Sequence, residues 1–254
     1  FIPFTSYISR VIIQYFPDEV IDRDINKPAI LHLDESALDE PTLAINNANA
    51  EIRGVVGLME RVVGSMVKPF IEGVDQKDVE DSSVDFQDGM DQRIEKISFL
   101  NQSISDYLLK TSRSELSEDQ TKEVYSLVSC TNYLDSMNNI VKMRFGAMLK
   151  NLNKDSKALS NDSQNEVLLY HKKMIKQLKR LNKFFEKFDR TKAKKIVQKM
   201  AKNKDLEEKY KLKVSQKTKK ANGTNDDDKL YTDLMEMLKQ LNIFIELIAS
   251  SLLT

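Results

Sequence analysis

Apolar residues recur at spacings of three and four through most of this chain, which is the pattern of a helix with one buried face. Glycine and proline, which favour turns, are scarce. They supply 7 and 5 of the 254 residues, against averages of roughly 7% and 5%. A chain with so few turn-forming residues is built from few, long elements. Both observations predict an all-α fold.

The apolar stripes predict six long helices with short connections. They cover about 41–74, 76–111, 117–153, 163–188, 191–221 and 227–252. Pro41 suits the first turn of the first helix, and Ser117 with Gln120 has the spacing of a capping box. The polar run 153–163 divides the helices into two sets of three. Since short connections favour antiparallel neighbours, we expect two tandem antiparallel three-helix bundles.

The first 40 residues differ from the rest of the chain. Residues 1–17 are amphipathic and largely apolar, which predicts a short N-terminal helix, and 18–40 read as an irregular linker. No apolar run reaches the ~20 residues needed to span a bilayer, and the start does not have the form of a secretory signal. The chain begins at Phe, and we interpret it as a fragment or a processed product.

Charge and cysteine content limit the class of protein. The 39 basic and 39 acidic residues balance, so the total gives no reason to expect a nucleic-acid partner. Lysines concentrate in 172–220, which we interpret as a solvated face of charge pairs. The alternative is that this tract binds an anionic lipid, RNA or an acidic partner.

The lone Cys130 excludes an intrachain disulfide and lies in an apolar stripe, so we expect it to be a core residue.

We find no motif for catalysis and expect no enzyme and no catalytic residue. The two histidines, His32 and His171, have no partner motif, and His171 is expected to be exposed within the lysine tract. Gly54, Gly57 and Gly64 lie inside a helical stripe. We expect them to permit close approach of helices rather than to bind phosphate.

The start of the first long helix is rich in amides. Asn46, Asn47 and Asn49 precede Glu51 within one and a half turns. We expect these side chains to cap the helix and to face solvent. Binding of an anion, or contact with a membrane domain, is the alternative.

Several phrases resemble the PhoU family. The segment 88–145 contains an acidic helix that ends in "YL", as in the family's first bundle. The next helix starts with Leu, Ser and acidic residues, as it does in the family. The phrase "NYLDSMNN" then stands at the place where the family sequence is roughly Asn-Asp-Leu-Glu-Arg-Ile-Gly-Asp. Further on, "NKDLEEKYKLKVSQ" and "DLMEMLKQLNIFI" resemble helices of the family's second bundle. A weak internal repeat aligns "LDSMN" at 134–138 with "LKQLN" at 238–242. The opening "ILHLDESALDEPTLAINNANAEI" is similar to the junction between membrane and PhoU-like domains in bacterial sodium/phosphate cotransporter-like proteins.

The resemblance implies a cytoplasmic regulatory domain of a sodium-dependent phosphate cotransporter, which modulates phosphate uptake at the cytoplasmic face of the bacterial inner membrane. It divides the chain into a helix and linker from the membrane domain at 1–40 and PhoU-like bundles at 41–155 and 160–254. The implied partner is the membrane transport domain of the same polypeptide, with a homodimer left open and no nucleic acid expected. Alternatives are a free-standing PhoU-like adaptor in phosphate signalling, or a helical scaffold that binds acidic membranes or nucleic acid.

Many PhoU-family members hold metal clusters on Glu/Asp-x-x-x-Asp motifs, because carboxylates one helical turn apart form an oxygen-rich pocket for hard cations. Here the motif reads Asp135-x-x-x-Asn139, and the second bundle has no acids at the matching positions. Asp91 and Glu95 on the preceding helix are candidates to face Asp135. We interpret these four residues as a degraded metal motif and expect no cofactor; a divalent or ferric ion in the first bundle is the alternative.

Overall fold

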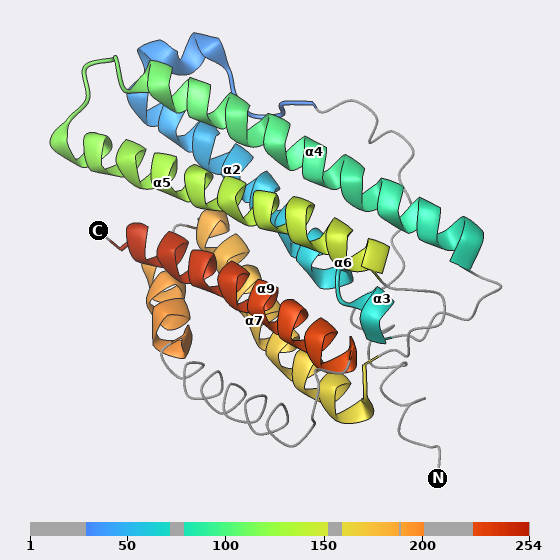
Figure 1. Ribbon diagram of the computed structural model, residues 1–254. Coiled ribbons are helices and arrows are strands. Elements are labelled where there is room, and N and C mark those ends of the chain that lie inside the picture. The colour runs from blue at the N-terminus through green and yellow to red at the C-terminus, as the bar shows by residue number, and fades with distance from the viewer. Residues whose placement is uncertain (1–28, 72–78, 152–158, 188, 201–225, 254) are drawn as a thin grey trace.

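The computed structural model describes residues 29–71, 79–151, 159–187, 189–200 and 226–253 (Figure 1). Every regular element in these ranges is a helix, which confirms the predicted all-α class. The elements are a short 3-10 helix η2 (Glu35–Asp39), α2 (Pro41–Ser65), α3 (Lys68–Ile71), α4 (Val79–Thr111), α5 (Glu118–Ile140), a π-helical turn η3 (Val141–Phe145), α6 (Gly146–Asn151), α7 (Asn161–Lys187) and α9 (Asp226–Ser251).

Two predictions concern segments that are described in part or not at all. Residues 190–200 are helical, in agreement with the start of the helix predicted at 191–221. The rest of that helix and the amphipathic helix predicted at 1–17 lie outside the described residues. The boundaries 1–40, 41–155 and 160–254 therefore stay predictions.

The start of α5 carries the predicted capping box. The Ser117 hydroxyl accepts a hydrogen bond from the Gln120 backbone N–H at 3.3 Å, and the Gln120 side-chain oxygen accepts one from the Ser117 N–H at 2.9 Å. These two bonds satisfy backbone donors that have no partner within a helix. Glu118 and Asp119 in the first turn add favourable charge at the positive end of the helix dipole.

We expect Ser117→Ala to lower the free energy of unfolding by about 1 kcal/mol, because one N–H at the helix start loses its partner. Urea unfolding followed by far-UV circular dichroism measures the change. Ser129→Ala is the control, since Ser129 lies mid-helix and its hydroxyl donates to the Tyr125 carbonyl, one turn earlier in the same helix. Equal losses in the two variants would contradict a capping role.

Two long predicted helices are interrupted. The helix predicted at 41–74 ends at Ser65, and α3 begins three residues later with Pro69 in its first turn, where the missing N–H of proline costs nothing. The helix predicted at 117–153 contains the π-helical turn η3 between α5 and α6. Phe145, at the end of this turn, packs edge-on against Phe70 of α3 with ring centroids 6.0 Å apart.

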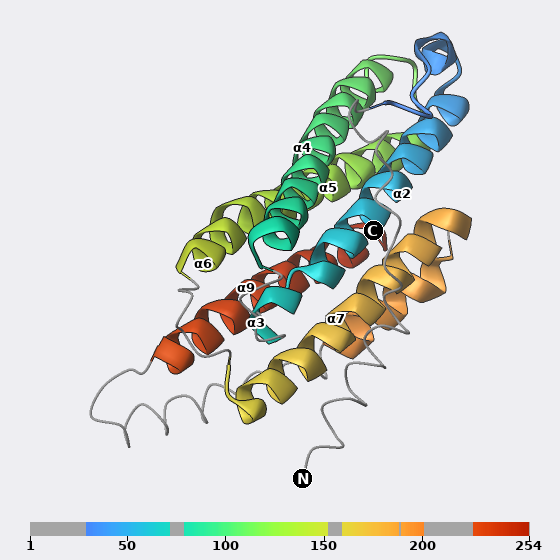
Figure 2. The same ribbon diagram turned by 90° about the vertical axis from the view of Figure 1, so that its right-hand side faces the viewer.

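Helices α2 and α5 lie at the centre of the structure. Helix α2 packs against α4, α5 and α7, while α5 also packs against α4 and α9, and α7 packs against α9 (Figures 1 and 2). Helices α2 and α7 are antiparallel, because Val63 meets His171 and Arg53 meets Glu186. Contacts of Cys130 with Ser251 and of Tyr133 with Phe244 show that α5 and α9 are antiparallel too.

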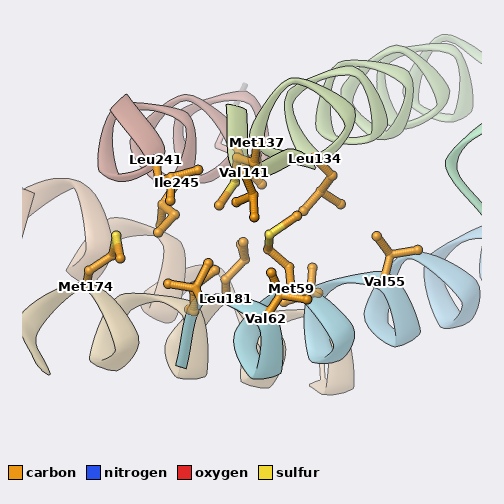
Figure 3. Packing of buried hydrophobic residues seen from close by; sticks show 14 of the residues in the cluster. Val55, Met59, Val62, Leu134, Met137, Val141, Met174, Leu181, Leu241 and Ile245 are labelled. Atoms are coloured by element: carbon orange, nitrogen blue, oxygen red, sulfur yellow. The ribbon is translucent and has the colours of Figure 1, made fainter. Parts of the chain in front are cut away.

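One hydrophobic core connects all these helices. Figure 3 shows its centre, where side chains from four helices meet: Val55, Met59, Val62, Leu134, Met137, Met174, Leu181, Leu241 and Ile245, with Val141 of η3. The polar run at 153–163 divides the helices in sequence. The apolar packing nevertheless continues from α2 to α7 and from α5 to α9.

Candidate functional site

The predicted metal motif lies on the outer part of α5 and α4. Asn139 is exposed and donates its side-chain N–H to the Asp135 carboxylate at 3.0 Å. Asp91 and Glu95 are exposed on α4. Among the described residues, no three His, Cys, Asp or Glu side chains come together in a group that could hold a metal ion. The structure thus joins Asp135 to Asn139, and a binding role for the four residues stays a prediction.

Asn138, which precedes Asn139 on α5, is fully buried. Its side-chain N–H group donates to the Ile94 carbonyl at 2.9 Å and to the Ser98 hydroxyl at 2.8 Å, both on α4. Its position in the repeat corresponds to Asn242 on α9, which is also buried and donates to the Tyr170 hydroxyl at 3.1 Å. The burial of Asn138 could have been predicted from the sequence, because Asn138 lies one helical turn after Leu134, a residue of the apolar stripe.

His171 is buried, and the prediction that it is exposed is wrong. Its side chain faces α2, where its Nε2 lies 2.7 Å from the carbonyl oxygen of Val63. Complete burial lowers the pKa of His171 to about 4, against a smaller opposite effect of the Val63 carbonyl. The imidazole is therefore neutral at pH 7 and donates its N–H to the last part of α2, where carbonyls have fewer partners within the helix.

Cys130 is a core residue, as predicted. Its side chain is fully buried, and its sulfur lies 3.5 Å from the Ser251 hydroxyl oxygen. Burial raises the pKa of this thiol to about 12. The reactive thiolate form is thus negligible at neutral pH, and Cys130 is unsuited to act as a nucleophile.

A groove of about 490 Å³ lies between α2 and the C-terminal part of α7. Its polar lining consists of His32, Asn46, Asn49, Arg53, Asn182 and Glu186, and the buried Phe185 contributes apolar surface. Three of these residues come from α2 at spacings of three and four, which places them on one face of the helix. The amide-rich helix start, for which capping and solvation were predicted, thus forms one wall of a groove.

Glu51 of α2 binds the backbone of Leu31 and His32, which precede η2. Its carboxylate is buried and accepts hydrogen bonds from the backbone N–H groups of Leu31 at 3.1 Å and His32 at 2.7 Å. A buried carboxylate is stable only when such donors surround it. These bonds hold His32 at the edge of the groove.

Asn49 carries an incompletely satisfied amide in the groove. The residue is only 1% exposed, and its N–H group makes a long hydrogen bond of 3.4 Å to Glu123. Its carbonyl oxygen is buried without a hydrogen-bond partner among the described residues.

The groove also contains the cationic side chain of Arg53, and it has open space beside Gly54. Arg53 is half exposed, and its partners are distant, with Asn182 at 3.5 Å and Glu186 at 3.7 Å. A methyl group added at Gly54 would meet no atom within 4 Å. The prediction that this glycine permits close helix approach is therefore wrong. At Gly57 an added methyl would lie 3.5 Å from the Asn182 side-chain nitrogen, which is an ordinary contact.

A second hollow, of about 500 Å³, is open and lies on the helical residues 190–200. Its lining is mainly basic: Thr191, Lys192, Lys194, Lys195, Gln198 and Lys199. Lys192 pairs with Asp189 at 3.4 Å, while Lys194, Lys195 and Lys199 are exposed. Residues 201–220 of the lysine tract lie outside the described residues, and the solvated face predicted for the tract stays a prediction.

None of the helices in the described part of the chain has the length and apolarity of a membrane span. Comparison with known proteins gives no relative. The chain matches no family model, no curated protein sequence and no solved structure.

Proposed function

We propose that this chain is a PhoU-like regulatory domain that acts without catalysis on a sodium-dependent phosphate cotransporter. In this proposal it lies at the cytoplasmic face of a bacterial inner membrane, and its partner is the membrane transport domain of the same polypeptide. It modulates phosphate uptake by binding and changing shape. Helices α2, α4 and α5 form the first bundle, and α7, the helix beginning at residue 190 and α9 form the second.

The observation that carries the proposal is the pair of buried asparagines in the internal repeat. Asn138 and Asn242 occupy matching positions in the two phrases that resemble the family, on α5 and α9. Both are buried, both donate to another helix of the same set of three, and in both the carbonyl oxygen has no hydrogen-bond partner among the described residues. A chance alignment of five positions, two of them identical, gives no reason to expect the same structural role twice.

The packing supports a regulatory role. A signal that moves one set of helices reaches the other through the contacts of α2 with α7 and of α5 with α9. Well-packed interfaces shift between discrete arrangements rather than deforming continuously. Such a module is suited to bias a transport cycle.

The test uses the complete native gene in bacteria that lack other phosphate uptake systems. We expect deletion of 41–254 to change the rate of sodium-driven uptake of radioactive phosphate, or its response to phosphate starvation. Immunoblots match the amount of transporter in the membrane, and replacement of sodium by potassium gives the background. Unchanged rate and unchanged regulation would refute the proposal, as would a native gene that encodes no membrane segments of ~20 apolar residues.

A further inference from the structure

We propose that the outer face of α7 binds the anionic lipid headgroups of a membrane surface. This face is formed by exposed lysines about one helical turn apart, here called the lysine row: Lys172, Lys176, Lys179, Lys183 and Lys187. The proposal rests on the proposed function for a membrane close to the chain, and it adds the surface with which the domain lies against that membrane. Binding to lipid vesicles tests it separately from phosphate uptake.

The lysine row occupies one side of a helix that the core holds in place. Its members follow one another at spacings of four, three, four and four, so that at ~100° per residue they lie within roughly 80° around the helix axis. The opposite side of α7 is buried: Met174, Leu178, Leu181 and Phe185 lie there. At ~1.5 Å per residue the row is roughly 22 Å long, and it meets a flat surface along this length.

Cations outnumber carboxylates strongly on α7. From 167 to 187 the helix has seven Lys or Arg residues and one carboxylate, Glu186. Glu186 pairs with Arg53 of α2 at 3.7 Å, and Glu60 of α2 lies 4.0 Å from the Lys179 ammonium. A face of charge pairs needs a carboxylate about one turn from each lysine, and this part of the tract lacks them. Clusters of about 4–8 cations on an amphipathic helix are instead typical of binding to anionic lipids.

The charges of the molecule are divided between two of its sides. The totals balance at 39 basic and 39 acidic residues, yet α4 exposes carboxylates where α7 exposes lysines. Its exposed carboxylates are those of Asp88, Asp91, Glu95 and Asp106, and the cations between them, Arg93 and Lys96, are only partly exposed. Helix α2 packs against both α4 and α7 and lies between them (Figures 1 and 2). An anionic surface therefore attracts the α7 side and repels the α4 side, which orients the domain.

The side chains of α7 favour lipid over nucleic acid as the anionic partner. Proteins that bind single strands stack the bases on aromatic rings, and Tyr170, Phe184 and Phe185 are all buried. Base edges in a duplex are contacted most often by arginine. Arg180 is only partly exposed, and its guanidinium donates to the Gln177 side chain at 2.7 Å.

One apolar side chain extends the lysine row toward the start of α7. Leu169 precedes Lys172 by three positions, so it lies on the same side of the helix, and it is 47% exposed. An apolar side chain beside lysines is suited to the boundary between lipid headgroups and acyl chains. Leu169 thus adds a contact that a purely electrostatic partner would not use.

The experiment measures binding of the whole chain to sucrose-loaded vesicles by sedimentation. Vesicles of phosphatidylcholine mixed with phosphatidylglycerol supply anionic headgroups, and vesicles of phosphatidylcholine alone do not. We expect binding only to the anionic vesicles at ~0.1 M salt and its loss at ~1 M salt, because the Debye length falls from ~10 Å to ~3 Å. A fluorescent single-stranded RNA, followed by polarisation in the same buffers, tests nucleic acid as the partner.

Two triple variants remove the same charge from different parts of the protein. The test variant replaces three lysines of the row: Lys176→Gln, Lys183→Gln and Lys187→Gln. The matched control replaces three exposed cations outside α7: Arg113→Gln, Lys122→Gln and Lys142→Gln. Both variants should fold, because substitutions at exposed positions usually change stability little, and circular dichroism checks this.

We expect the test variant to bind anionic vesicles at least about tenfold more weakly than the original, because each lysine near the surface adds to the attraction. The control variant should bind almost as the original does. Absence of binding, equal losses in the two variants, or binding of RNA in place of anionic vesicles would overturn the proposal. None of these results bears on whether deletion of 41–254 alters phosphate uptake, and a failed deletion test would not change the measured binding to vesicles.

Discussion

Met59→Ala will lower the free energy of unfolding by about 2–5 kcal/mol, the range for truncating a buried methionine or leucine. Met59 is fully buried on α2 and lies in the part of the core where four helices meet (Figure 3). Because α2 packs against α4, α5 and α7, the cavity weakens contacts on both sides of the polar run at 153–163. We therefore expect the loss of stability to affect all the described helices.

Hydrogen exchange followed by mass spectrometry shows which helices lose stability, and urea unfolding measures the total change in the free energy of unfolding. Amides of α4 and of α9 should lose protection together and by similar amounts. Leu109→Ala is the control, since Leu109 is 55% exposed on α4 and surface changes usually stay within about 0.5 kcal/mol. Loss of protection confined to α4 and α5, with α9 unchanged, would contradict a single cooperative core.

His171 will make the protein less stable as the pH falls from about 6.5 to about 4. The pKa of His171 is lowered by burial from 6.5 to about 4, so in this range the unfolded chain binds a proton that the folded protein does not. Stability then falls by about 1.4 kcal/mol per pH unit. The full effect over the range is about 3 kcal/mol, and above pH 6.5 this residue contributes no pH dependence.

His171→Gln tests this directly, because the glutamine side chain can still donate an N–H to the Val63 carbonyl but does not titrate. Urea unfolding at a series of pH values from 7 to 4 should show a shallower loss of stability for His171→Gln than for the original protein. His32→Gln, at an exposed position, should follow the original. Parallel curves for the original and His171→Gln would show that His171 does not control the acid response.

Local spacing in the sequence was sufficient to predict the long helices that the structure describes and several of their ends. Pro41 and the Ser117–Gln120 box mark helix starts because their bonds involve residues within one turn, which a sequence shows directly. The π-helical turn at Val141–Phe145 was missed because the apolar stripe continues through it. His171 was misplaced because the neighbouring lysines suggested solvent, although its spacing from Val167 and Met174 puts it on the buried face.

The groove could not be predicted from spacing, because it depends on contacts between distant segments. The amides at the start of α2 were recognised, but nothing local indicates that Glu51 binds the backbone of residues 31–32 or that Asn182 lies across from Gly57. Similarly, Asp135 and Asn139 were recognised as a pair one turn apart. Their hydrogen bond to each other is local, within one turn of α5. The burial of Asn138 beside them depends on the rotation of α5 against α4, which places its side chain against Ile94 and Ser98.

The antiparallel packing of α2 with α7 and of α5 with α9 has a consequence for the history of the gene. In the proposed division into two sets of three helices, first helix meets first helix and third helix meets third helix, each in opposite directions. This is the isologous contact by which two identical subunits pair about a two-fold axis. A gene duplicated by fusion of a half-length ancestor that paired with itself would retain this interface within one polypeptide. The fused halves would then be free to diverge.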